Sequence, residues 1–293
     1  MILVAGSANL DFVVQASHIP APGETVLGRD FRTFPGGKGA NQAIACARAG
    51  GIATEMLLAL GNDAFAGPIE ISLQQAGVRT HVVRVDDQPT GTAFICVSDD
   101  AENAITVAPG ANNALREVHL PALKGFTHLL LQLETPIETV TAYARAARSR
   151  GVKVVLNAAP ARALPVELLS LVDVLVVNKG ELATVSGHQG SIDQCMERID
   201  VPCIVVTLGD RGCCARVERE LIMQDAFAVM PVDTTAAGDT FCGVLVAALG
   251  NGLRMPEALR QANAAGALAC TRLGAQSSIP THAELQTFLQ MHP

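Results

Sequence analysis

Short apolar runs recur along the chain, and their residue types predict strands that are buried on both faces. Most of the runs are rich in strand-forming residues and do not alternate with polar ones, which is typical of strands in a parallel sheet. They span residues 2–5, 56–60, 129–133, 152–156, 174–177 and 204–206. Helical patterns lie between them at residues 39–49, 136–149, 181–186 and 238–249. This order predicts an α/β fold, with a central, mostly parallel sheet flanked by helices on both faces.

Two segments, 13–35 and 81–108, do not follow this alternation. They are rich in β-branched residues and turn formers, and we predict that they form antiparallel strands of a small separate β-sheet. Such a sheet would cover a site as a lid. The alternative is an ordinary extension at the edge of the main sheet. The other segments, 1–12, 36–80 and 109–293, are assigned to one large α/β domain.

Polar residues follow the predicted strands of the large domain. In chain order they are Asn9 and Asp11, Asp63, Glu134, Asn157, Asn178, and Thr207 with Gly209. Any one of them could be a helix cap. Because ligands of open parallel sheets bind beyond the carboxyl ends of the strands, this recurrence favours a binding site at that edge.

The composition narrows the class of protein. The chain has 293 residues, of which 49% are hydrophobic, and a net charge of -7. The negative charge argues against nucleic acid or an anionic membrane as the main partner. No apolar run approaches the roughly 18 residues that a membrane span needs, and the short apolar start at residues 1–6 is expected to be a first strand rather than a signal peptide.

The cysteines and histidines show no metal-binding pattern. None of the eight cysteines forms a C-x-x-C pair, and the seven histidines show no ligand spacing. A core of this size needs no disulfides, so we expect buried free thiols and a reducing, cytoplasmic location.

The first chemical motif is Gly36-Gly37-Lys38-Gly39-Ala40-Asn41-Gln42. Glycines around a lysine allow the backbone to approach a ligand closely, and the following helix offers free N–H groups at its start. The motif is not a Walker A loop, because glycine rather than serine or threonine follows Lys38, and it is not G-x-G-x-x-G, because Gln42 replaces the last glycine. The alternative is a plain tight turn.

The second motif is Asp233-Thr234-Thr235-Ala236-Ala237-Gly238-Asp239-Thr240. Small residues lead into an apolar helix and leave its first N–H groups open to an anion. A helix cap alone would explain Asp239, but not the small residues before it. A phosphate cradle beside a carboxylate that can accept a proton predicts phosphoryl transfer, with Asp239 as the general base.

Together these motifs resemble the ribokinase-like carbohydrate kinase family over almost the whole chain. The resemblance also rests on Ser7-Ala8-Asn9-Leu10-Asp11, Pro22-Gly23-Glu24-Thr25, Gln132-Leu133-Glu134-Thr135-Pro136, Asn157-Ala158-Ala159-Pro160-Ala161, Thr207-Leu208-Gly209-Asp210-Arg211-Gly212 and Gly274-Ala275-Gln276.

The resemblance implies a role for each matched residue. It assigns catalysis to Asp239 and to an anion hole formed by the backbone of Ala236, Ala237 and Gly238. It assigns the sugar to Asn9, Asp11, Gly37, Lys38, Asn41, Glu134 and Asp239. It assigns ATP to Asn178, Thr207, Gly209, Gly212, Gly238 and Asn263, and magnesium handling to Asn178 with Glu181. A potassium site would use Asp233, Thr235, backbone carbonyls near Ala269, Arg272 and Gly274, and the Ser278 hydroxyl.

Two residues depart from the family pattern. Lys179 stands where a second acid is frequent, which could weaken the magnesium network or add a cation near the phosphates. Cys242 stands where asparagine is common.

The resemblance implies a magnesium- and potassium-dependent enzyme that phosphorylates the 5-hydroxyl of D-ribose with ATP, and a homodimer formed through the lids. A kinase for 2-deoxyribose or another small sugar would share every motif. A nucleoside kinase is disfavoured by the scarcity of aromatic residues, since Tyr143 is the one tyrosine and tryptophan is absent. A non-catalytic sugar-binding protein would be expected to lack Asp239 or the glycines.

Overall fold

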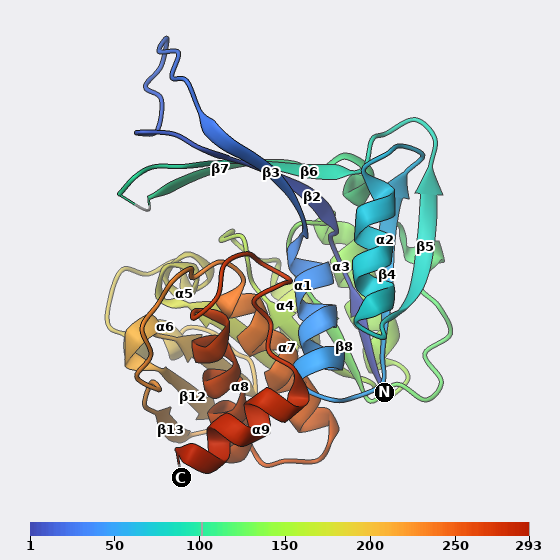
Figure 1. Cartoon of the computed structure of the whole chain (residues 1–293). Coiled ribbons are helices and arrows are strands. Elements are labelled where there is room, and N and C mark those ends of the chain that lie inside the picture. The colour runs from blue at the N-terminus through green and yellow to red at the C-terminus, as the bar shows by residue number, and fades with distance from the viewer. Residues whose placement is uncertain (101, 293) are drawn as a thin grey trace.

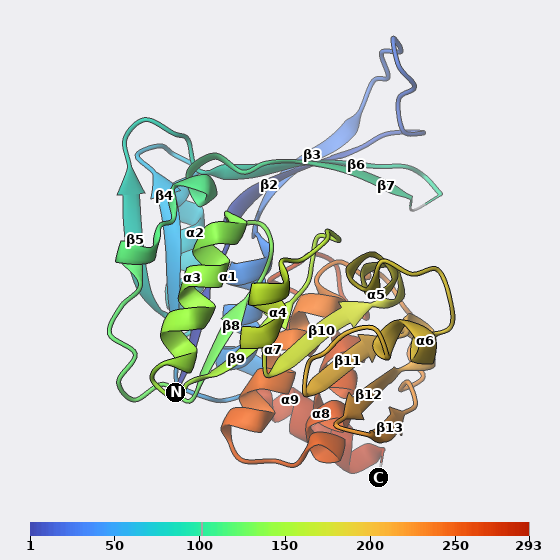
Figure 2. The ribbon, with the colours of Figure 1, turned by 180° about the vertical axis from the view of Figure 1, so that it is seen from behind.

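The computed structural model describes residues 1–100 and 102–292, and it contains a nine-stranded sheet at the centre of a large domain (Figures 1 and 2). The strand order is β13-β12-β11-β10-β9-β8-β1-β4-β5. The strands from β5 to β11 in this order pair in parallel, and β12 and β13 add an antiparallel edge. Their bounds are β1 (Ile2–Ala5), β4 (Thr54–Gly61), β5 (Arg79–Val85), β8 (His128–Leu131), β9 (Lys153–Asn157), β10 (Val174–Asn178), β11 (Cys203–Thr207), β12 (Cys213–Val217) and β13 (Glu220–Gln224).

Helices cover both faces of this sheet, which confirms the predicted fold class. One face carries α1 (Lys38–Ile44), which continues as a π-helical turn (Ala45–Ala49), and α2 (Ala66–Gln75), α7 (Ala237–Gly250), α8 (Met255–Ala269) and α9 (His282–Met291). The other face carries α3 (Ile137–Arg148), α4 (Val166–Leu171), α5 (Lys179–Ser186) and α6 (Ile192–Met196). Successive residues of a strand therefore enter opposite cores: Ile2 and Val4 face the first set of helices, and Leu3 faces the second. This explains why the strands read as unbroken apolar runs.

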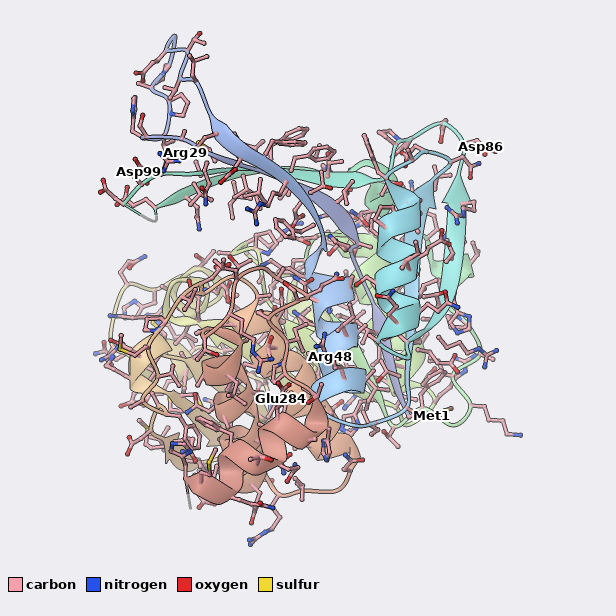
Figure 3. All side chains as sticks on the ribbon, in the orientation of Figure 1. Met1, Arg29, Arg48, Asp86, Asp99 and Glu284 are labelled. Carbon is pink, nitrogen blue, oxygen red and sulfur yellow. The ribbon has the colours of Figure 1, made fainter. Side chains whose placement is uncertain are left out.

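A second sheet, of four strands in the order β3-β2-β6-β7, projects over the carboxyl edge of the large sheet (Figure 1). Its strands are β2 (Asn9–Gln15), β3 (Arg29–Gly36), β6 (Gly91–Val97) and β7 (Asn103–Ala108). At its far end the side chains of Arg29 and Asp99 form an ion pair (Figure 3). We call this sheet the lid.

The prediction that all lid strands are antiparallel is wrong for the central pair. β2 pairs with β3, and β6 with β7, in antiparallel fashion, but β2 and β6 are parallel. The reason is that both strands leave the large domain side by side, starting at Asn9 and Gly91, which are register partners. Each then turns back through its own hairpin.

The limits of the lid differ from the expected ones at two strands. Residues 81–85, expected in the lid, belong to β5 and pair with β4 in the large sheet. Residues 9–12, expected in the large domain, belong to β2 of the lid sheet. Within the described part of the chain, no helix combines the length and the apolar character needed to cross a membrane.

Candidate active site

Three neighbouring cavities lie along the carboxyl edge of the large sheet and the start of α7, and one of them is also lined by the lid. The lid cavity, of about 490 Å³, lies between the lid strands and the loop before α7. The central cleft, of about 170 Å³, contains Asp239, and the outer cavity, of about 480 Å³, runs along α7 and α8. Thr234 lines both the lid cavity and the outer cavity, and Gly238 lines both the central cleft and the outer cavity. The three cavities therefore form one site with a lid side and an outer side.

The glycine motif brings the backbone between β3 and α1 close to the strand-end residues. A Cβ on Gly36 would lie 2.1 Å from Oδ2 of Asp11, and a Cβ on Gly37 would lie 2.7 Å from Cα of Ala8. Gly37 also has a φ of +88°, a backbone conformation that residues other than glycine rarely adopt. The motif is therefore a close approach of backbone to the site and not only a tight turn.

Two carboxylates stand on the lid side. Asp11, on β2, is buried, and burial together with the charges of Glu134 and Asp239 raises its pKa to about 7. Glu134 accepts hydrogen bonds at Oε2 from the Ser7 hydroxyl at 2.6 Å and from the Lys38 backbone N–H at 3.2 Å. Carboxylate oxygens so placed can accept hydrogen bonds from the hydroxyls of a small polar ligand.

The remaining lid-side residues are held by their neighbours. Asn9 accepts a hydrogen bond at Oδ1 from Nδ2 of Asn112, at 2.8 Å. Lys38 lines the central cleft, and the negative charge of Asp239 raises the pKa of its ammonium group. Lys38 therefore places a cation in the central cleft, close enough to Asp239 to interact with its charge.

Asp239 lies in the first turn of α7 and is buried. Its Oδ2 accepts a hydrogen bond from Nδ2 of Asn41 at 2.9 Å, and its Oδ1 accepts one from Nε2 of Gln42 at 2.8 Å. Both donors are on α1. Two side-chain donors on one helix therefore fix the orientation of the Asp239 carboxylate.

The loop before α7 is free of side chains that could block an anion. Ala236, the residue before the helix, has a φ of +57° in the left-handed region, which costs a residue with a Cβ on the order of 1 kcal/mol. A Cβ on Gly238 would meet no atom within 4 Å. The helix start therefore offers its first N–H groups and its dipole to open space.

The predicted nucleotide residues line the outer cavity or the adjacent cleft. Thr207, Gly209, Gly212, Gly238 and Asn263 line the outer cavity. Asn178 and Glu181 line the central cleft, where they form a reciprocal cap at the start of α5, with distances of 2.9 and 2.8 Å. The side-chain oxygens of these two residues are the type of ligand that a phosphate-bound magnesium ion takes from a protein.

The two departures from the family pattern lie in different places. Lys179 is exposed and lines a separate cavity between α5 and α6, so it does not add a cation to the central cleft. Cys242 is buried and lines the cleft.

Asp233 ties two loops together. Its Oδ1 accepts a hydrogen bond from the Thr235 N–H and its Oδ2 accepts one from the Gly274 N–H, both at 2.9 Å. The Ser278 hydroxyl donates to the Ala275 carbonyl at 2.8 Å. The Ala269 carbonyl accepts from the Arg272 N–H, and the Arg272 side chain pairs with Glu284. Carboxylate, carbonyl and hydroxyl oxygens on these adjacent loops are ligand types that suit a monovalent cation.

The structure separates one strand-end residue from the others and adds several that sequence reasoning missed. Asp63 accepts hydrogen bonds from the backbone of Phe65 and Thr90 and anchors the turn before α2. The missed residues are Ser7, Gln42, Asn112 and Gln276, whose side chains hold those of the candidate site. Ser7, Gln42 and Gln276 lie in segments that carry the family resemblance, but the sequence indicates no partner for their side chains.

Comparisons with known proteins agree on one family. The sequence model described as pfkB family carbohydrate kinase matches residues 1–282. The ribokinase of Haemophilus influenzae is 38% identical to this chain, over 99% of this chain and 98% of that protein. The crystal structure of ribokinase from Thermotoga maritima matches with a TM-score of 0.91 and 36% identity, covering 99% of each chain. The structure of Arabidopsis thaliana ribokinase complexed with ribose and ATP matches with a TM-score of 0.91 and 32% identity, covering 99% of this chain and 98% of that one.

We predict that Asp11→Asn stabilises the unliganded protein at and above neutral pH. The pKa of Asp11 is raised from its ordinary value of 3.8 to about 7 on folding. The ionised form therefore opposes folding increasingly as the pH rises from about 4 to about 7, and the cost is complete above that range, on the order of 2–4 kcal/mol. Denaturant unfolding at pH 5 and pH 8 should show a larger gain for the variant at pH 8.

The exposed residue Asp87 provides a matched control. Asp87→Asn should leave the unfolding free energy close to that of the wild type at both pH values. Equal stability of Asp11→Asn and wild type at pH 8 would contradict the argument.

Proposed function

The chain belongs to the pfkB family of carbohydrate kinases, and we propose that it transfers the γ-phosphate of ATP to the 5-hydroxyl of D-ribose. The observation that carries this proposal is the position of Asp239. It lies at the helix start that can receive a phosphate and beside the cavity that holds Asp11. The names of full-length relatives support ribose as the acceptor.

Ribose would bind on the lid side of the site. Asp11 and Glu134 accept hydrogen bonds from ring hydroxyls, and Lys38 and Asn41 donate to them. The backbone of Gly37 would border the sugar, and the absence of a Cβ lets it pack directly on the backbone of Ala8 and Asn9. With its ring held there, the sugar presents its primary hydroxyl to Asp239.

The chemical step is an in-line displacement at phosphorus. Asp239 takes the proton of the sugar 5-hydroxyl while the hydroxyl oxygen forms a bond to the γ-phosphorus. The bond from that phosphorus to the bridging oxygen breaks, and the electron pair leaves with ADP. The N–H groups at the start of α7 stabilise the charge on the transferring phosphoryl group.

Two cations complete the proposal. Asn178 and Glu181 would hold the magnesium ion of the nucleotide, which neutralises phosphate charge. The Asp233 loop and the loop after α8 would hold potassium and fix the shape of the anion-binding turn. In both places the residues present supply oxygen donors.

We place the enzyme in the cytoplasm and propose that it is a homodimer. All eight cysteines lie in the described part of the chain and are free thiols, which suits a reducing compartment. The outer face of the lid carries Phe31 and Phe94, which are 64% and 54% exposed, on either side of Phe12. An apolar sheet face with open edges usually needs a partner.

We predict that ribose is the best acceptor in a panel that also contains 2-deoxyribose, fructose and adenosine. A site that hydrogen-bonds each hydroxyl disfavours analogues that lack one, because its buried polar groups are then left unpaired. The measurement is kcat/KM for each acceptor with saturating MgATP. A higher value for fructose or adenosine would overturn the ribose assignment and leave the family assignment standing.

The same assay with Asp239→Asn tests the mechanism. Loss of a general base costs on the order of 10²–10⁴-fold in kcat, whereas ribose and ATP should still bind, as measured by calorimetry. Turnover close to that of the wild type would exclude Asp239 as the base.

We predict that potassium activates the enzyme. An ion between the Asp233 loop and the loop after α8 would hold the anion-binding turn in its productive shape. Initial rates in potassium chloride should be several-fold higher than in tetramethylammonium chloride at equal ionic strength. Asp233→Asn should reduce this difference, and equal rates for the wild type in both salts would refute the site.

We predict that the double substitution Phe31→Glu with Phe94→Glu converts the protein to a monomer. Charges on the outer lid face would be buried without partners in a lid-to-lid dimer. Light scattering at micromolar concentration measures the mass directly. Val118→Glu, at a position 86% exposed and outside the lid, is the control that should remain dimeric, and a monomeric wild type would refute the dimer.

A further inference from the structure

A chain of three hydrogen bonds leads from Asp239 to the back of the site. Asn41 donates from Nδ2 to Oδ2 of Asp239 at 2.9 Å. Gln276 donates from Nε2 to Oδ1 of Asn41 at 3.1 Å. The Ser72 hydroxyl donates to Oε1 of Gln276 at 2.5 Å. These hydrogen bonds therefore connect helix α2, the loop after α8 and helix α1 in series, and the last of them reaches the carboxylate of Asp239.

The direction of every bond in this chain follows from Asp239. An ionised carboxylate only accepts hydrogen bonds, so Asn41 must turn its NH₂ group toward it and its oxygen toward Gln276. Gln276 must then present its own NH₂ group to Asn41 and its oxygen to Ser72, whose hydroxyl supplies the last proton. Asn41 and Gln276 are each only 6% exposed, so a reversed amide would face a like group with no water to correct it.

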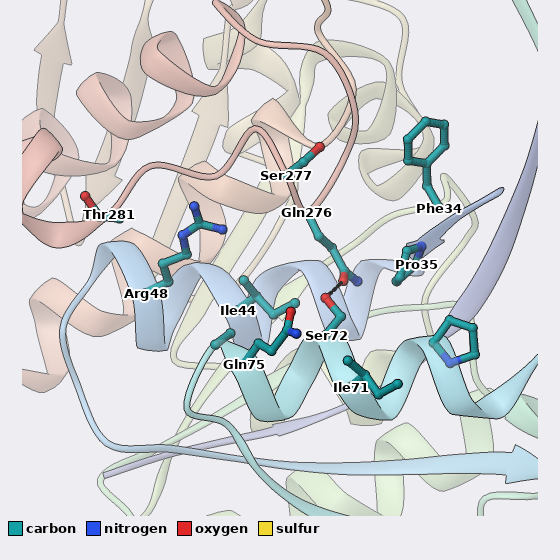
Figure 4. Close-up of a pocket in the computed structure, with 12 residues that line it drawn as sticks. Phe34, Pro35, Ile44, Arg48, Ile71, Ser72, Gln75, Gln276, Ser277 and Thr281 are labelled. Carbon is teal, nitrogen blue, oxygen red and sulfur yellow. Dashed lines mark hydrogen bonds between the residues drawn. The ribbon is translucent and has the colours of Figure 1, made fainter. Parts of the chain in front are cut away.

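The outer end of the chain lies away from the candidate active site. Ser72 and Gln276 line a different cavity, of about 650 Å³, between β3, α1, α2 and the loop after α8 (Figure 4). Figure 4 shows Gln276 reaching across α1 to meet Ser72 on α2. Neither residue lines the lid cavity, the central cleft or the outer cavity. The hydrogen-bonded route from these residues to Asp239 runs through Asn41.

We propose that Gln276 and Ser72 are positioning residues for the general base, acting through the amide of Asn41. Gln42 donates to Oδ1 of Asp239 independently. The hydrogen bonds from Ser72 through Gln276 and Asn41 therefore act on Oδ2 of Asp239 and fix its position. Without them, the Asn41 amide loses the partner that keeps its NH₂ group on Asp239, and the carboxylate is free to turn away from the sugar hydroxyl. The inference rests on the proposed function, in which Asp239 is the base.

The test compares variants of Gln276 and Ser72, the two residues of this row of hydrogen bonds that lie farthest from Asp239. Gln276→Met keeps the length and charge of the side chain and removes both hydrogen bonds, and we expect kcat to fall about 10–100-fold, as for a displaced catalytic group. Ser72→Ala removes one neutral hydrogen bond and should lower kcat about 2–10-fold. Ser72→Thr keeps the hydroxyl and should restore most of the rate. KM for ATP should stay unchanged in all three.

The pH dependence of kcat separates positioning from general damage. Gln276→Met changes the hydrogen bonding around the proposed base, so the acidic limb of the profile should move relative to that of the wild type. Lys38, Asp11, Glu181 and Cys242 also act on Asp239 electrostatically, or are acted on by it, and they are the same in every variant. A purely structural role would lower activity without moving this limb.

Gln75→Ala is the matched control, because Gln75 is exposed and lines the same cavity one turn along α2. It should match the wild type in rate and profile. If Gln276→Met does not fold, the Ser72→Ala and Ser72→Thr pair decides, since Ser72 is only partly buried. Wild-type rates and profiles in Gln276→Met or Ser72→Ala would overturn the positioning role alone. A wild-type protein that phosphorylates no sugar would overturn the proposed function and this role together.

Discussion

The buried carboxylate of Asp239 imposes the constraint on which the rest of the site depends. A charge removed from water is costly unless donors surround it, and α1 supplies one side-chain amide to each oxygen. These amides are buried as well, so their own oxygens need donors, which Gln276 and Gln132 provide. One charge thus explains why buried amides gather where α1, α7, the end of β8 and the loop after α8 meet.

A second constraint is the close packing of backbone at the candidate site. Gly36 has no space for a Cβ beside Asp11, and Ala236 adopts a left-handed conformation to open the start of α7. Both features work against stability, as does the raised pKa of Asp11. They are concentrated at one edge of a sheet whose interior is otherwise apolar on both faces, so the large core offsets local costs that the chemistry requires.

The sheet, its helices and the two chemical motifs could be predicted from the sequence because each leaves a local signal. A doubly buried strand is an unbroken apolar run, and a helix start stripped of side chains is a run of small residues. The hydrogen-bond partners could not be predicted, because Asn41 and Gln276 are 235 residues apart. Asp63 shows the opposite limit: it follows a strand just as Glu134 does, but the adjacent turn uses its carboxylate. Strand-end position alone does not tell a ligand-binding residue from a turn.

The path of β2 connects the site to the lid. This strand begins at Asn9, at the carboxyl edge of the large sheet, and runs out through Asp11 to Gln15 in the lid sheet. Asp11 is therefore a lid residue by pairing and a site residue by position, whereas Asp239 belongs to the large domain. The negative charge of Asp239 contributes to the raised pKa of Asp11, so the two carboxylates interact although one belongs to a lid strand and the other to a helix of the large domain. The base of the lid and the start of α7 are thus linked through the electrostatics of the site as well as through the path of the backbone.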